Sequence, residues 1–144
     1  MTKKRPPSRK PEILSRNFEI TAFRTSLRLG ILQERGDEPE IEAKPWLELT
    51  GKASEPVRDV TAWRVSMYPE EPLRLGTARP APVGALIQAR PELAIVLTWP
   101  HREFDRLWAM ALLGQLKHAH VSFTKPHYNS GLVVAASFSN EIEE

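Results

Sequence analysis

Two of the four histidines have the type and spacing of metal ligands. His118 and His120 are two positions apart in a segment whose pattern predicts a β-strand, so both imidazoles should project from the same face. A metal site needs a third and usually a fourth ligand, and His127 in the following turn is the remaining candidate. A glutamate three or four residues after the pair would strengthen the hypothesis, but Phe123 and Thr124 occupy those positions. A metal-dependent enzyme is therefore one hypothesis, and two histidines on the solvated face of a hairpin are its alternative.

The rest of the sequence contains no recognisable catalytic constellation. The absence of cysteine excludes disulfides, thiolate metal sites and a cysteine nucleophile. Neither a Gly-x-Ser-x-Gly motif nor a phosphate-binding glycine loop is present. The alternating carboxylates Glu38, Glu40 and Glu42 indicate a solvated strand face rather than a pair of catalytic acids. The sequence gives no catalytic residue and no cofactor, and it favours a non-catalytic role.

Positive charge is concentrated at the N-terminus. Residues 1–16 contain six cations and one acid, a net charge of 6 − 1 = +5, whereas residues 17–144 contain 14 cations and 17 acids, a net charge of −3. The six cations are Lys3, Lys4, Arg5, Arg9, Lys10 and Arg16. Few apolar residues accompany them, so we predict a disordered basic arm over 1–16. Such an arm either binds the phosphates of a nucleic acid or only keeps the protein soluble.

A second basic feature lies inside the first predicted strand. Arg24 and Arg28 flank Ser26 at alternate positions, so their side chains should share one face. Arg64, on a later predicted strand, would extend this strip if the two strands are neighbours. The strip and the arm together are the basis of an alternative functional hypothesis, a sequence-nonspecific nucleic-acid-binding protein. For the strip itself, the sequence favours an ordinary solvated face with acids such as Glu48 nearby.

The hydrophobic pattern predicts mostly strands. Alternating apolar residues indicate strands over 17–32, 41–53, 57–68, 93–98, 116–124 and 132–139, with a shorter one over 85–89. The alternation changes parity near Ala22 and Phe23, which predicts a β-bulge. For the last hairpin, the apolar pattern favours a register that pairs Phe123 with Leu132.

One amphipathic helix is predicted from Pro100 to Leu113, with Gly114 ending it. The expected fold is therefore mainly β. We predict a single domain over 17–144, built as an antiparallel two-layer sandwich or a curved sheet of about six or seven strands with this one helix.

The leading functional hypothesis is a non-catalytic binding or assembly module. A protein partner, or a second copy of the chain, would contact sheet edges at residues 46–50 and 133–139. It would also contact the proline-rich 69–84 loop, where Arg74 and Arg79 are the candidate contacts. No apolar run has the length of a membrane span, and no hydrophobic segment follows the basic N-terminus. We therefore expect a cytoplasmic protein without a membrane partner.

Overall fold

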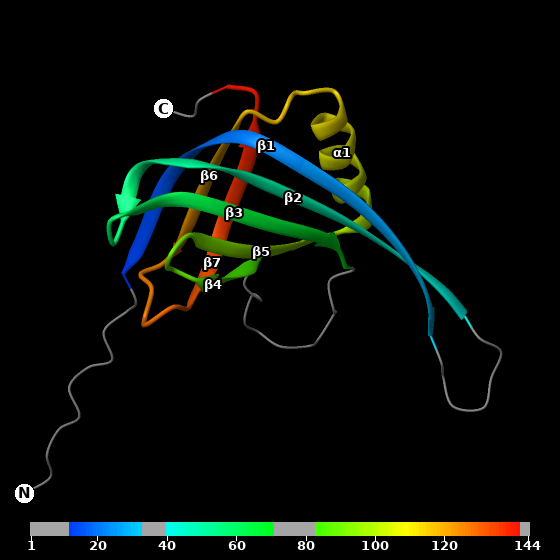
Figure 1. Cartoon of the computed structure of the whole chain (residues 1–144), viewed down its shortest axis with the longest axis horizontal. Coiled ribbons are helices and arrows are strands. Elements are labelled where there is room, and N and C mark those ends of the chain that lie inside the picture. Colours follow the sequence, from blue (N-terminus) through cyan, green and yellow to red (C-terminus); the bar gives the residue numbers. More distant parts are fainter. Residues whose placement is uncertain (1–11, 33–39, 71–82, 142–144) are drawn as a thin grey trace, which may run out of the picture.

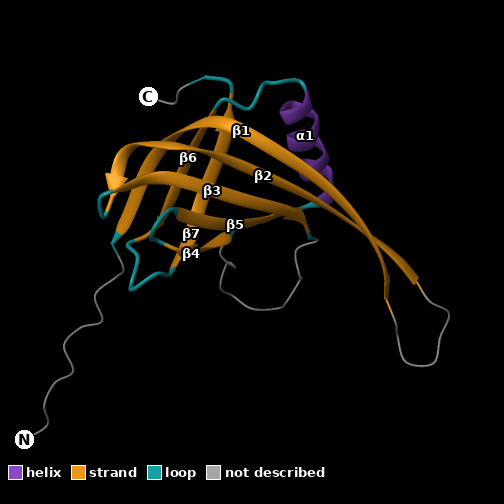
Figure 2. Ribbon diagram, viewed as in Figure 1, coloured by secondary structure: helices purple, strands orange, loops and turns teal. Residues whose placement is uncertain are grey.

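The computed structural model describes residues 12–32, 40–70 and 83–141 (Figure 1). This part of the chain is mainly β-strand and contains one helix, as the sequence predicts (Figure 2). The elements are β1 (Ile13–Leu32), β2 (Glu40–Val57), β3 (Val60–Pro69), β4 (Gly84–Gln88), β5 (Leu93–Trp99), α1 (His101–Leu112), β6 (His118–Thr124) and β7 (Gly131–Ser139).

The strands form a closed barrel in the order β1-β2-β3-β5-β4-β7-β6. The predicted sandwich or curved sheet is wrong, because β1 pairs with β2 along one side and with β6 along the other. The predicted antiparallel arrangement holds for every pair of neighbours except β3 and β5, which run parallel. Inward-facing apolar residues fit a barrel as well as a sandwich, so hydrophobic alternation does not distinguish the two folds.

Aromatic and aliphatic side chains from all the strands fill the barrel. Phe18 and Trp63 pack ring against ring, with centroids 4.4 Å apart, and both are fully buried. Along β3, the alternate residues Trp63, Val65 and Met67 are all buried. Burial of this alternating set is the main stabilising contribution to the fold.

Helix α1 connects the end of β5 to the start of β6 and turns one side into the same core. Phe104, Leu107 and Ala111 are buried in that core, whereas Leu112, predicted on the apolar stripe, is exposed. The predicted helix end is confirmed at Gly114, whose φ of +70° is the left-handed conformation that favours glycine. Among the described residues, no helix has the length and apolar character needed to cross a membrane.

The first two strands are much longer than the barrel and leave it as a two-stranded ribbon (Figure 1). Pairing between β2 and β3 ends at Leu47 and Met67, while pairing between β1 and β2 continues to Leu32 and Glu40. The predicted bulge is present between Ile20 and Ala22, and the Thr21 hydroxyl donates to the Thr50 carbonyl there. The bulge reverses the parity of β1, so residues that would face inward face outward beyond it.

The predicted boundary of the basic arm is too late. Strand β1 starts at Ile13, so residues 13–16 are paired with β6 instead of belonging to a disordered arm. Arg16 in particular lies opposite Val121. The remainder of the predicted arm, residues 1–11, lies outside the described residues.

One of the two predicted sheet edges is closed. Residues 47–50 of β2 have β1 on one side and β3 on the other, so they offer no free edge. In β7, pairing with β6 extends to Ser139, whereas the pairing with β4 that the described residues show covers only Gly131 to Val133. Closure into a barrel therefore removes the first of the two edges on which the leading hypothesis depends, whereas residues 134–139 have no β4 partner among the described residues.

The predicted register of the last hairpin is also wrong. Phe123 lies opposite Val133, not Leu132, and a bulge follows at Val134. The Leu132 N–H donates to the Thr124 hydroxyl at 2.8 Å in place of a regular ladder bond. This side-chain bond shifts β7 by one residue, so Val133 is buried while Leu132 and Val134 are exposed.

Candidate nucleic-acid interface

Arg24 and Arg28 lie on the outer face of β1, where the ribbon leaves the barrel. Their register partners on β2 are Glu48 and Lys44, and the partner of the intervening Ser26 is Trp46. Partners in an antiparallel pair project from the same face, so this strip gains a lysine and an indole from β2. Arg24, Ser26, Arg28, Lys44 and Trp46 line a hollow of about 410 Å³, which we call the basic hollow.

Trp46, which lines the basic hollow, stacks on Tyr68 of β3. Trp46 and Tyr68 lie with their ring planes 5° apart and their centroids 5.4 Å apart. Tyr68 occupies the β3 side of the indole, and the small side chain of Ser26 occupies the β1 side. The ring of Trp46 therefore has a neighbour on one face and open space above a serine on the other.

A second, larger hollow adjoins the first. It has a volume of about 670 Å³, and Lys44 and Trp46 line both hollows. Tyr68, Glu70 and His101 lie along its far side. The two hollows are adjacent at Lys44 and Trp46, and both volumes are in the range of about 300–1,000 Å³ typical of ligand sites.

The charge of the basic hollow is positive. Among the described residues, its lining includes Arg24, Arg28 and Lys44 and no acid. The Glu48 carboxylate forms an ion pair with the Arg24 guanidinium at 3.2 Å, and 16% of the Glu48 side chain is exposed. This carboxylate offsets the charge of one of the three cations. Arg28 is exposed and has no ion-pair partner among the residues the structure describes. An exposed guanidinium beside an aromatic ring can contact phosphate and base at once.

Other predicted nucleic-acid contacts lie away from the basic hollow. Arg64 shares the outer face of the sheet, opposite Thr50, but binds Glu92 at 3.4 Å and does not line the hollow. Arg16 donates to the carbonyl oxygens of Ser15 and Pro56. The remaining predicted nucleic-acid contacts lie outside the described residues: Lys3, Lys4, Arg5, Arg9 and Lys10. Arg74 and Arg79, the predicted contacts for a protein partner, also lie outside them.

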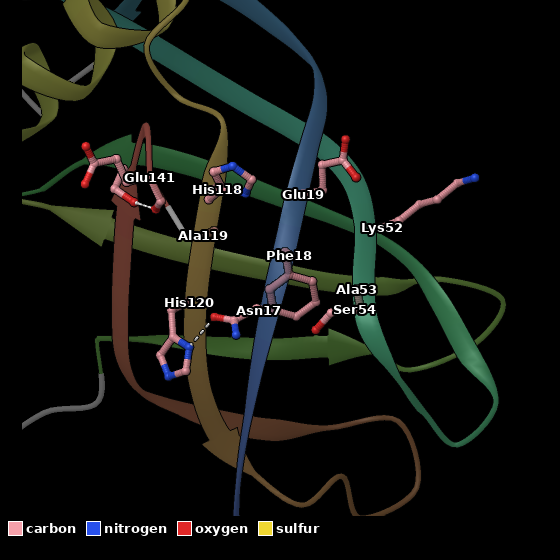
Figure 3. Close-up of a pocket in the computed structure, with 11 residues that line it drawn as sticks. Asn17, Phe18, Glu19, Lys52, Ala53, Ser54, His118, Ala119, His120 and Glu141 are labelled. Atoms are coloured by element: carbon pink, nitrogen blue, oxygen red, sulfur yellow. Dashed lines mark hydrogen bonds between the residues drawn. The ribbon is translucent and has the colours of Figure 1, made fainter. Parts of the chain in front are cut away.

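His118 and His120 share the outer face of β6, as predicted, and line a separate hollow of about 390 Å³ (Figure 3). The His120 Nδ1 lies 2.7 Å from the Asn17 Oδ1, a hydrogen bond between β6 and β1. Glu19 and Glu141 also line this hollow.

The third predicted histidine is not brought to the other two. His127 is in the turn after β6, where it bridges to Ser130 and packs edge-on against Tyr128. In residues 12–32, 40–70 and 83–141, no three histidine, cysteine, aspartate or glutamate side chains are arranged to hold a metal ion. The His118–His120 pair therefore lines an outward-facing polar hollow, and the hydrogen bond from His120 to Asn17 connects β6 to β1.

The sequence reasoning missed Lys44, Trp46 and Tyr68. Trp46 was assigned only to a predicted sheet edge and Tyr68 only to a strand, because the face that each presents depends on the β1–β2 and β2–β3 registers. The Arg-x-Ser-x-Arg pattern was the one available signal. Pairing it with Lys44-Pro45-Trp46 across the ribbon would have placed the indole opposite the serine.

Comparisons with known proteins give no relative for this chain. A scan against known protein families, a search of curated protein sequences and a search of solved structures each found no match.

Proposed function

We propose that this protein is a non-catalytic nucleic-acid-binding module that holds the phosphate backbone on the outer face of its β1–β2 ribbon. The observation that carries the proposal is the basic hollow, in which three cations surround an aromatic ring. Basic grooves lined with aromatic rings are the usual means of binding nucleic acid without sequence preference, because phosphates and base faces recur at every nucleotide.

The position of the hollow on the ribbon supports the proposal. The ribbon extends beyond the barrel, so a long polymer can lie along it (Figure 1). The basic N-terminal residues Lys3, Lys4, Arg5, Arg9 and Lys10 add attraction for the same ligand. Binding of this kind is electrostatic, so it must weaken as salt is added.

Fluorescence anisotropy with short labelled DNA and RNA strands over a salt series tests the proposal. The test variant is Arg28→Gln with Lys44→Gln. Its matched control is Arg102→Gln with Arg106→Gln, which removes two exposed cations from α1. On single strands each lost phosphate contact changes the slope of log affinity against log salt by about 0.7, so the test variant should lose about 1.4. Equal slopes for the test and control variants would refute the assignment of this face.

A variant of the arm separates the two basic features. Replacing Lys3, Lys4, Arg5, Arg9 and Lys10 by glutamine leaves the chain length unchanged. If the ribbon carries the binding, this variant keeps the difference between the test and control slopes, although its overall affinity is lower. If the arm alone binds, all salt dependence disappears with it.

A protein-binding module is the second candidate, and the opposite face of the ribbon favours it. Phe23, Leu27 and Leu29 are 46%, 67% and 70% exposed, and they alternate with the basic residues of the other face. Exposed apolar residues gathered on one face are typical of interaction surfaces. Light scattering would detect self-association through this face, and Leu27→Gln with Leu29→Gln should abolish it. A strictly monomeric protein at high concentration would refute association with a second copy.

A further inference from the structure

The basic hollow lies beside the Trp46–Tyr68 stack, and Trp46 is one of its lining residues. Tyr68, Trp46 and Ser26 lie in successive positions across β3, β2 and β1 on the outer face. The first two are aromatic and stacked, and the third is small. The space above Ser26 is therefore bounded on one side by a flat indole and on the others by Arg24, Arg28 and Lys44.

We infer that this space binds an unpaired nucleobase, so that the protein selects single strands over duplexes; the inference rests on the proposed function. A base that enters it would extend the stack from two rings to three. Its phosphates would lie beside Arg28 and Lys44, which flank the hollow at the ribbon side. In a duplex the base faces are covered by neighbouring pairs, so a duplex can use the cations but not the indole.

The charge pattern fits a base with its phosphate better than a bare aromatic ligand. The Arg24–Glu48 ion pair holds one guanidinium at the edge of the hollow, where a planar cation can lie against a base. Arg28 has no comparable carboxylate among the described residues, so its guanidinium is available to a phosphate oxygen. The bound unit would thus be a nucleotide within a single-stranded DNA or RNA.

Filling the space tests the inference directly. Ser26→Phe places a ring where the base would lie and leaves every cation unchanged. Ala22→Phe is the matched control, because Ala22 is exposed on the same strand, about 13 Å away, and does not line the hollow. Affinities of the full-length proteins would be measured for single-stranded DNA, single-stranded RNA and the corresponding duplexes.

We expect the wild-type protein to prefer single strands and Ser26→Phe to lose that preference. Loss of one base stack should weaken single-strand binding about 5- to 150-fold and leave duplex binding unchanged. A cooperative urea unfolding transition like that of the wild type shows that the variant is folded. Trp46→Leu, which removes the stacking surface and fills no space, should give the same pattern.

Each of the other outcomes refutes either the base-binding inference or the proposed function. If Ser26→Phe and Trp46→Leu bind single strands as tightly as the wild type, the base-binding inference is wrong, while electrostatic binding by the ribbon stands. If single strands and duplexes bind equally to the wild type, the inference is wrong as well. If the wild type binds neither at low salt, the proposed function fails, and the inference fails with it.

Discussion

Gly51 is the position where a single methyl group should do the most damage to the fold that holds the basic hollow. It lies opposite Ile20, at the β1 bulge that turns Arg24 and Arg28 outward. A Cβ at this glycine would lie 1.8 Å from the Glu19 carbonyl oxygen and 2.6 Å from the Trp63 Nε1. The Trp63 indole N–H already donates a hydrogen bond to the Glu19 carbonyl oxygen at 3.3 Å, so no space is left between them.

The cost of Gly51→Ala follows from these contacts. Overpacking of this kind typically costs about 1–3 kcal/mol. Displacing Trp63 also leaves its buried N–H without an acceptor, at a further cost of about 1–3 kcal/mol. We therefore expect a loss of about 3 kcal/mol in the free energy of unfolding. For a chain of this size that is a fall of roughly 6–12 °C in Tm.

Urea unfolding followed by tryptophan fluorescence measures this loss, since buried Trp63 reports directly on the core. Gly30→Ala is the control, because a Cβ at Gly30 has no atom within 4 Å. Its free energy of unfolding should stay within about 0.5 kcal/mol of the wild-type value. A Gly51→Ala protein with the same urea midpoint as the wild type would refute the close approach of β1, Gly51 and Trp63.

Three further changes test other parts of the barrel. Arg58→Met removes the donor that joins the β2–β3 turn to the carbonyl oxygens of Pro126 and Tyr128, the latter at 2.8 Å, and should lower the free energy of unfolding by about 1–3 kcal/mol in urea titrations. An unchanged midpoint would show that the two turns are independent. Thr124→Val removes the acceptor of the Leu132 N–H, so amide exchange at Leu132 should accelerate, and exchange at the wild-type rate would contradict the hairpin register described above. Leu27→Ser should leave the free energy of unfolding within about 0.5 kcal/mol of the wild-type value, because Leu27 is 67% exposed. Leu47→Ala should lower the free energy of unfolding by about 2–5 kcal/mol, because Leu47 is fully buried. Equal effects of the two substitutions would show that the ribbon face is covered in solution.

Local patterns in the sequence predicted the features that depend on a single segment. The change of parity in β1 placed the bulge within two residues of its observed position, because alternation records directly which residues face the core. The helix was found with its ends one residue from those observed, and its C-terminal glycine has the expected positive φ. These features depend on neighbours in the chain.

Features that depend on distant segments were not predicted. Closure of the barrel rests on pairing between β1 and β6, which are about a hundred residues apart, and nothing in either strand specifies that partner. The strands predicted over 41–53 and 57–68 leave a break at residues 54–56, whereas the chain turns at Arg58 and Asp59, both with positive φ. Pro56 lies in the irregular stretch of β2 between Lys52 and Val57, where the β2–β3 ladder is interrupted and its missing N–H costs little.

For the candidate site as well, the sequence predicted what depends on one strand and not what depends on the pairing of strands. The alternation of Arg24, Ser26 and Arg28 was visible in the sequence, and the shared face followed from strand geometry alone. The contribution of Trp46 required the β1–β2 register, and that of Tyr68 required the order of three strands. His118 and His120 were correctly placed on one face, but the fold gives them Asn17 as a neighbour and leaves His127 elsewhere.

Photo-cross-linking to a single strand containing thio-substituted uracil is the most direct test of nucleic-acid binding by the ribbon. Trypsin does not cleave before Pro45, so Trp46 is in the peptide 36–52 and Tyr68 is in the peptide 65–74. Mass spectrometry should find the cross-linked nucleotide on one or both of these peptides, with Trp46 as the main site. Cross-links confined to the basic N-terminal residues or to the α1 surface, with none on either peptide, would contradict the assignment of the basic hollow as the binding surface.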